Sequence, residues 1–150
     1  LPQPEKRLFS LSDLLHNLEE LLQTNFQENN ISFTLRCSPE PMMTEGDEKQ
    51  LSQVFLNLLK NAMQALEGHP HGELSLQAEQ DEYIVIDITD NGPGIPPEIM
   101  DKVFIPFFTT KSEGTGIGLS LCKEIIRRHE GHLAIKESRA GKTVFHIELP

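Results

Sequence analysis

The sequence predicts a two-layer α/β sandwich, in which amphipathic helices pack on one face of a sheet. Two observations lead to this fold class. Three stretches repeat their apolar residues with the period of a helix, and five stretches alternate apolar and polar residues with the period of a strand. Because every strand alternates, we expect one buried face, covered by the helices, and one solvated face.

The helices are expected at residues 11–27, 48–67 and 117–130. Ser10 with Asp13 can form a capping box at the start of the first helix, and Asp47 with Gln50 can start the second. Gly131 suits the end of the third helix. The first helix is expected to carry a row of leucines on its apolar face: Leu11, Leu14, Leu15, Leu18, Leu21 and Leu22.

The strands are expected at residues 31–37, 73–80, 83–90, 132–138 and 143–150. Residues 1–7, "LPQPEKR", resemble a severed, proline-rich linker, and a single domain is expected over residues 8–150. Residues 91–116 show little periodicity beyond a short helical turn near residues 98–102. A gap of this length in a compact domain is usually functional or disordered.

Composition excludes some classes of partner. The formal net charge of −10 argues against nucleic-acid binding, which needs clustered Lys and Arg, although one local pocket can still hold a nucleotide. No apolar run is long enough to cross a bilayer and no signal peptide opens the chain, which begins at Leu1 and is expected to be an excised piece. Cys37 and Cys122 are expected to be buried thiols in a reducing compartment, with neither a disulfide nor a zinc site.

Asp90 ends an isoleucine-rich strand and is in phase with the buried side of that strand. One interpretation is that Asp90 simply starts a turn, because Asp, Asn, Gly and Pro are common turn residues. The other is that the carboxylate accepts a hydrogen bond from a ligand amine, while Gly92 and Gly94 let the backbone approach a flat ring closely.

Asn57 and Asn61 lie four residues apart on the polar face of the second helix. They can belong to an ordinary solvated face. However, Asn is a poor residue inside a helix, and its amide oxygen suits Mg²⁺, which takes few protein ligands and completes its shell with water and phosphate.

Two further stretches can contact phosphates. "GTGIGLS", residues 114–120, feeds a helix from a glycine-rich turn, which favours an anion; neither a P-loop nor a dinucleotide fingerprint occurs in the chain. "FIPFFTTK", residues 104–111, carries phenylalanines that are either core residues or anchors of a mobile lid. Lys111, Thr109 and Thr110 would supply a charge and hydroxyls.

In this order, the stretches resemble the catalytic, ATP-binding domain of bacterial sensor histidine kinases. The matching pieces are "NLLKNAMQAL" (the N box), "DNGPGI" (G1), "VFIPFFTTK" (the F box) and "GTGIGLS" (G2). "PFFTTK" before "GTGIGLS" is most similar to the nitrogen-regulation sensors. The tail departs from the family with "HEGH" where H-G-G is common, and with "GKTVF" where G-T-x-F is common.

The resemblance implies the Bergerat-type ATP-binding fold of gyrases, MutL and heat-shock chaperones, an α/β (α+β) two-layer sandwich with three helices on a mixed sheet of about five strands. It implies ATP and Mg²⁺ as cofactors. Asp90 should accept from the adenine amino group, Asn61 should bind Mg²⁺, and Asn57 and Lys60 should lie near the phosphates.

The resemblance also implies an ATP lid at about residues 95–116, which closes over the phosphates. Asn57, Lys60 and Lys111 are the expected catalytic residues, and Asn61 is the expected metal ligand. The expected nucleotide contacts are Asn57, Asn61, Asp90, Gly92, Gly94, Ile95, Phe104, Thr109, Thr110, Lys111, Gly114, Thr115, Gly116, Ile117, Gly118 and Leu119.

Three activities are compatible with these motifs. A histidine kinase domain would pass the γ-phosphoryl group to a histidine on another domain, a gyrase- or chaperone-type ATPase would use ATP as a clamp, and a pseudokinase would only bind. Clamp ATPases place a glutamate at the position of Asn57. An amide cannot serve as a general base, which favours the kinase.

The phosphoacceptor histidine is expected outside this sequence, on a domain before Leu1 that also makes the full protein a homodimer. His16 lies in "LLHNLEELL", which lacks the acceptor context of the family. We expect a response regulator as partner, a cytoplasmic location, a membrane anchor only in other parts of the protein, and little autophosphorylation by this fragment alone. All the histidines are interpreted as structural or surface residues: His16, His69, His71, His129, His132 and His146.

Overall fold

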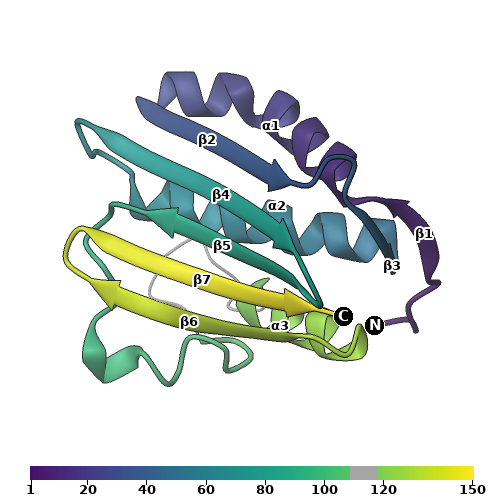
Figure 1. Cartoon of the computed structure of the whole chain (residues 1–150). Coiled ribbons are helices and arrows are strands. Elements are labelled where there is room, and N and C mark those ends of the chain that lie inside the picture. The colour runs from purple at the N-terminus through teal and green to yellow at the C-terminus, as the bar shows by residue number, and fades with distance from the viewer. Residues whose placement is uncertain (109–117) are drawn as a thin grey trace.

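The computed structural model describes residues 1–108 and 118–150 and has two layers (Figure 1). A five-stranded sheet has the strand order β2-β4-β5-β7-β6, and α1, α2 and α3 cover one of its faces (Figure 1). The β2–β4 pair is parallel and the other pairs are antiparallel, so the expected mixed sheet is confirmed. The helices are α1 (Leu11–Glu28), α2 (Glu48–Ala65) and α3 (Gly118–Arg128); the strands of this sheet are β2 (Ile31–Ser38), β4 (Gly72–Gln80), β5 (Ile84–Asp90), β6 (His132–Arg139) and β7 (Lys142–Leu149).

Both predicted helix starts are confirmed. Ser10 Oγ accepts from the backbone N–H of Asp13 at 3.1 Å, and Asp47 Oδ1 accepts from that of Gln50 at 3.1 Å. Each bond satisfies one of the orphan N–H groups of a helix N-terminus. The prediction that Leu21 lies on the apolar face of α1 is wrong, because Leu21 is 65% exposed. The buried face of the helix continues through Leu22 and Phe26 instead.

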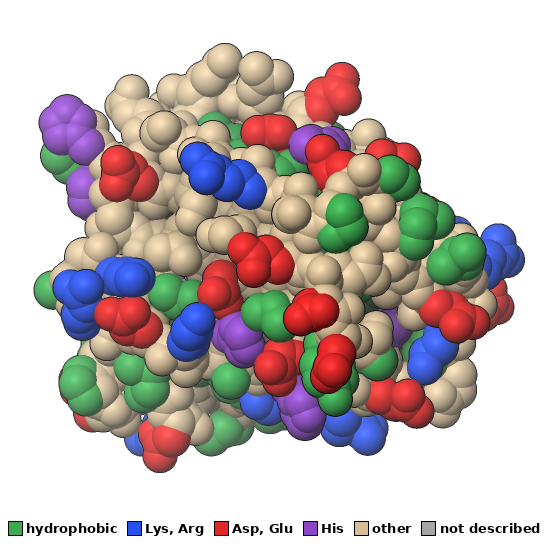
Figure 2. Space-filling model, viewed as in Figure 1, with side chains coloured by type: hydrophobic (Ala, Val, Ile, Leu, Met, Phe, Trp, Pro, Cys, Tyr) green, Lys and Arg blue, Asp and Glu red, His purple; other side chains and the backbone are tan. Residues whose placement is uncertain are grey.

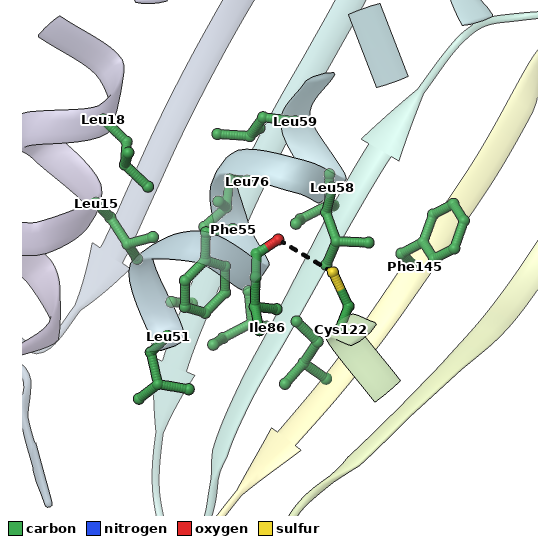
Figure 3. Packing of buried hydrophobic residues seen from close by; sticks show 14 of the residues in the cluster. Leu15, Leu18, Leu51, Phe55, Leu58, Leu59, Leu76, Ile86, Cys122 and Phe145 are labelled. Atoms are coloured by element: carbon green, nitrogen blue, oxygen red, sulfur yellow. Dashed lines mark hydrogen bonds between the residues drawn. The ribbon is translucent and has the colours of Figure 1, made fainter. Parts of the chain in front are cut away.

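The core lies between the three helices and the covered face of the sheet. Figure 3 shows α1 leucines, α2 side chains such as Phe55, and strand residues such as Ile86 and Phe145 meeting in one cluster. Cys122 of α3 is fully buried in it, as expected, and its thiol donates to the carbonyl oxygen of Val54 at 3.7 Å (Figure 3). Burial raises the pKa of this thiol to about 12, so it stays protonated at neutral pH.

The other face of the sheet is uncovered and polar, as predicted. Figure 2 shows acidic, basic and histidine side chains scattered over the viewed face. On this face His146 Nδ1 lies 2.6 Å from Asp87 Oδ1, and Lys136 Nζ lies 3.2 Å from Asp87 Oδ2. None of the helices in the described part of the chain has the length and apolar character that a membrane span requires.

The sequence patterns did not reveal a second, two-stranded sheet made by β1 (Arg7–Ser10) and β3 (Met43–Gly46). Four residues are too few to show a clear alternation. The segment before β1 contacts the domain: the Glu5 N–H donates to Asp47 Oδ2 at 2.9 Å, and the Pro2 carbonyl accepts from Gln50 Nε2 at 3.0 Å.

The end of α3 differs in detail from the sequence pattern. Glu130, with φ +62°, adopts the left-handed conformation, and the Gly131 N–H donates to the Ile126 carbonyl at 2.9 Å. A Cβ on Gly131 would lie 2.3 Å from the Glu148 carbonyl oxygen, so the glycine is needed for close packing on β7. The adjacent His129 is buried and structural, as expected: its Nε2 accepts from the Asp47 N–H at 3.0 Å.

The region between β5 and α3 is only partly described. It contains the short 3₁₀ helix η1 (Pro97–Ile99) near the predicted helical turn, followed by turns up to residue 107. Residues 109–116 of the predicted lid, with Ile117, lie outside the described residues.

Candidate functional site

Asp90 is the last residue of β5, a central strand that pairs with β4 and β7. Its side chain is 4% exposed and follows the buried alternation of the strand, so the carboxylate faces the helix layer as predicted. The Gly92 N–H donates to Asp90 Oδ1 at 2.8 Å. Burial raises the pKa of Asp90, and the bond from Gly92 opposes that rise. A buried carboxylate without a cationic partner is costly, and such groups concentrate at functional sites.

The two glycines after Asp90 are required by close backbone packing. A Cβ on Gly92 would lie 2.9 Å from Asp90 Oδ1 and 3.1 Å from the carbonyl oxygen of Ala65, the last residue of α2. Gly94 has φ +85°, and its Cβ would lie 2.5 Å from the carbonyl oxygen of Arg139 in β6. The loop therefore passes between α2 and the β6–β7 hairpin, which brings Asp90 beside the end of α2.

The polar face of α2 leads away from Asp90. Asn61 and Asn57 lie one and two turns before Ala65, about 6 and 12 Å along the helix axis. A hydrogen bond with the Asn57 side chain lowers the pKa of Cys122 against the larger effect of burial, so Asn57 lies on the side of α2 that faces α3. Asp90, Asn61 and Asn57 thus form a line from the end of β5 toward α3.

Lys60 lies elsewhere on α2. It lines a cavity of about 460 Å³ between α1 and α2, together with Leu21, Leu56 and Met63. The structure therefore places Lys60 on the α1 side of α2, whereas Asn57 faces α3. The described residues do not bring Lys60 into the line of Asp90, Asn61 and Asn57.

The described part of the predicted lid is fixed to the sheet at two points. The Ile95 N–H donates to Ser138 Oγ at 2.8 Å. The Phe104 ring meets Phe145 edge-on at a centroid distance of 6.4 Å, and Lys123 Nζ lies 4.5 Å from the Phe104 centroid. Phe104 is thus partly a core residue and partly an anchor, which combines the two interpretations made from the sequence.

Lys123 was missed by the sequence reasoning. Its Nζ also donates to the Leu133 carbonyl oxygen at 2.8 Å, so it connects α3, β6 and the segment that holds Phe104. A lysine in an amphipathic helix has the appearance of a solvated residue, and no sequence signal distinguished this one.

Two further predicted contacts, Gly118 and Leu119, lie at the N-terminus of α3. Gly118 is its first residue, and among the described residues no atom lies within 4 Å of a Cβ built there. Leu119 packs partly against the core. The other predicted contacts lie outside the described residues: Thr109, Thr110, Lys111, Gly114, Thr115, Gly116 and Ile117.

Comparison with known proteins identifies one family. The family HATPase_c, described as histidine kinase-, DNA gyrase B- and HSP90-like ATPases, matches residues 46–150. Sporulation kinase C of Bacillus subtilis (strain 168) is 38% identical over 144 residues, which cover 93% of this chain and 33% of that protein. The sensory histidine kinase/phosphatase NtrB of Rhodobacter capsulatus is 34% identical over 161 residues, covering 98% and 44%. The chain thus spans less than half the length of these relatives.

Solved structures show the same fold. The catalytic domain of histidine kinase ThkA superposes with a TM-score of 0.88 at 32% identity, covering 97% of this chain and 95% of that one. ThkA in complex with the response regulator protein TrrA gives a TM-score of 0.81 at 30% identity, covering 97% and 41%.

Proposed function

Because the chain belongs to the family of histidine kinase-, DNA gyrase B- and HSP90-like ATPases, we propose that it binds Mg-ATP and donates the γ-phosphoryl group to a histidine in two-component signalling. The acceptor histidine would lie on a dimerisation and phosphoacceptor domain outside this sequence. The observation that carries the proposal is the buried Asp90 carboxylate at the end of a central strand, held beside α2 by Gly92.

Asp90 would select adenine. The Gly92 N–H engages Oδ1, so Oδ2 is the atom that would accept from the exocyclic amino group. Guanine carries a carbonyl oxygen at the corresponding ring position, and two facing acceptors repel each other. The site would therefore discriminate between adenine and guanine nucleotides by leaving a buried carboxylate unpaired with the wrong base.

The Asn residues of α2 would hold the metal and the phosphates. Their neutral amide oxygens suit a hard cation that shares its coordination shell with phosphate and water, and their line along α2 leads from the base site toward the N-terminus of α3. Mg²⁺ would neutralise phosphate charge there. Asn61 would be its protein ligand, and Asn57 would contact the phosphates.

The other two predicted catalytic residues, Lys60 and Lys111, have different expected contributions to the phosphate site. Lys60 would have to reach the phosphates from the α1 side of α2, so we expect it to contribute less than Asn57. Lys111, with Thr109, Thr110 and the glycines of residues 114–118, would complete the phosphate site from the lid at about residues 95–116.

The neutral Asn57 supports phosphoryl transfer over hydrolysis. Activation of a water molecule needs a general base, and an amide does not accept a proton at physiological pH. A histidine acceptor brings its own nucleophilic nitrogen, so the domain needs only to position and neutralise the phosphates. A clamp ATPase or a binding-only pseudokinase remains the second candidate, since it would use the same nucleotide site.

The name of one relative suggests a partner. ThkA was solved in complex with a response regulator protein, and we propose that a response regulator also receives the phosphoryl group from the protein that contains this chain. The parts outside this sequence would supply the homodimer interface and any membrane anchor.

Labelled ATP tests the activity. With ATP carrying a radioactive γ-phosphate, a longer chain that includes the upstream region should acquire an acid-labile, alkali-stable phosphoryl group, whereas this chain alone should bind ATP and stay unlabelled. Supplying the upstream region as a separate polypeptide should restore labelling of that region. Rapid release of free phosphate by this chain, with no labelled histidine in the longer one, would establish the ATPase instead.

A further inference from the structure

Three side chains with metal-binding atoms meet where α1 crosses the end of β2. The two elements run in opposite directions, with Phe26 stacked on Phe33 at a centroid distance of 4.6 Å at the far end. From Phe26 back to His16, ten residues of α1 rise about 15 Å. From Phe33 on to Cys37, four residues of β2 extend about 13 Å. This match in length brings His16 of α1 over Cys37 of β2.

Glu40 completes the group from the connection between β2 and β3. Its Oε1 lies 2.5 Å from His16 Nε2, and the two side chains are each 48% exposed, so both can be reached from solvent. Cys37, which the sequence predicted to be buried, is only half-buried beside them. The ligand atoms of His16, Cys37 and Glu40 all lie within 4.8 Å of one another.

A second carboxylate lies near the histidine. Glu19, one turn after His16 on α1, has Oε1 3.8 Å from His16 Nδ1. Two carboxylates, those of Glu40 and Glu19, therefore lie close to this histidine.

An exposed His–Glu ion pair would explain His16 and Glu40, and packing against the core would explain Cys37. Neither explains why the three ligand atoms converge. Two carboxylates surround this group of ligand atoms: Glu40 lies 2.5 Å from His16 Nε2 and Glu19 lies 3.8 Å from His16 Nδ1. Their negative charges would attract a dication to the ligand atoms.

We propose that His16, Cys37 and Glu40 form a binding site for a divalent transition metal ion, with Zn²⁺ as its occupant. Zn²⁺ takes thiolate, imidazole and carboxylate ligands together, whereas Mg²⁺ and Ca²⁺ require oxygen. Bond lengths of 2.0–2.3 Å in a tetrahedron place ligand atoms about 3.5 Å apart. Rotation of the half-exposed His16 and Glu40 side chains would achieve that spacing. On binding, the Cys37 thiol would release its proton to solvent, and water would fill the fourth position.

The site is separate from the proposed nucleotide site. In the sheet, Cys37 pairs with Ala78 of β4, whereas Asp90 pairs with Leu74 of the same strand. Ala78 and Leu74 are four residues apart, which is about 13 Å along β4. Across the sheet, β2 and β5 are separated by two strand spacings. Zn²⁺ would therefore tie α1 to the end of β2 without contacting ATP.

Calorimetric titration of the chain with ZnCl₂, in a large excess of Mg²⁺ to occupy oxygen-only sites, tests the proposal. We expect one Zn²⁺ per chain. Loss of an orienting partner typically costs 10–100-fold in metal affinity, so loss of a ligand in Cys37→Ser, His16→Gln or Glu40→Gln should weaken binding at least tenfold. His132→Gln, at an exposed histidine of β6, should bind as the parent does.

Substitution of Co²⁺ for Zn²⁺ identifies the ligands directly. The parent should show a thiolate-to-cobalt charge-transfer band, which Cys37→Ser should remove while its circular dichroism stays native. Absence of one-to-one binding in the parent would refute the site. The site would also be refuted if Cys37→Ser lost binding while His16→Gln and Glu40→Gln bound Zn²⁺ as the parent does. The thiol would then bind the metal without the other two ligands.

Discussion

Replacement of Asp90 by Asn separates what the buried carboxylate does for binding from what it does to stability. Asn has nearly the same shape and keeps an oxygen that can accept from the Gly92 N–H. It removes the negative charge that would face the adenine amino group. A hydrogen bond to a charged group contributes roughly 1–3 kcal/mol, so ADP affinity should fall about 5- to 150-fold.

The same substitution should not cost stability. Burial raises the pKa of Asp90 in the folded chain above its ordinary value of 3.8. A raised pKa means that the folded state prefers the protonated acid, so this stability is fully present below pH 3.8 and is lost as the pH rises through the folded pKa. At neutral pH, Asp90→Asn should therefore unfold at the same temperature as the parent or at a higher one, and the advantage should shrink as the pH falls toward 3.8.

Calorimetry with ADP and GDP, alongside thermal denaturation between pH 4 and 8, measures both effects. The parent should bind ADP far better than GDP, and Asp90→Asn should lose most of that difference. Equal ADP affinity in mutant and parent would place Asp90 outside the nucleotide site. A strongly lowered melting temperature at neutral pH would show that the carboxylate is a structural acceptor, and the functional reasoning would fail.

Three further outcomes follow from the structure. Glu130→Gly should raise the free energy of unfolding by about 1 kcal/mol, because φ +62° disfavours a side chain; a decrease in chemical denaturation would contradict this. Gly94→Ala should destabilise the fold by more than about 2 kcal/mol, since a Cβ meets the Arg139 carbonyl oxygen at 2.5 Å with φ at +85°, and unchanged melting would refute that contact. Asn61→Ala should abolish the Mg²⁺ enhancement of ATP-analogue binding with little effect on melting, and a surviving Mg²⁺ dependence would remove Asn61 as ligand.

The sequence patterns predicted most of the fold because apolar periodicity and helix capping depend only on residues close together in the chain. The expected helices and the five strands of the main sheet appear within a few residues of their predicted bounds, and Ser10 and Asp47 cap α1 and α2 as expected. The errors occur where local signal is weak. Leu21 lies at the margin of an apolar stripe, and β1 and β3 are too short to alternate clearly.

The sequence alone also placed Asp90 in phase with Ile86 and Ile88 on the buried side of its strand, while leaving a simple turn open. The structure decided for burial. The sequence also predicted which residues contact a nucleotide, through motifs whose order resembles one family. A side chain's direction along a strand and the chemistry of a motif are both set within a few residues of chain.

Only the tertiary structure decided which distant groups meet. Lys60 and Asn57 lie three residues apart on α2, but the packing decided that Lys60 borders the cavity against α1 while Asn57 contacts Cys122 of α3. Glu40 follows Cys37 by three residues, but His16 is 21 residues before Cys37, and only the antiparallel crossing of α1 over β2 places His16 beside both. Contacts of this kind depend on the direction and register of packed elements, which are set by the whole core rather than by any short stretch of sequence.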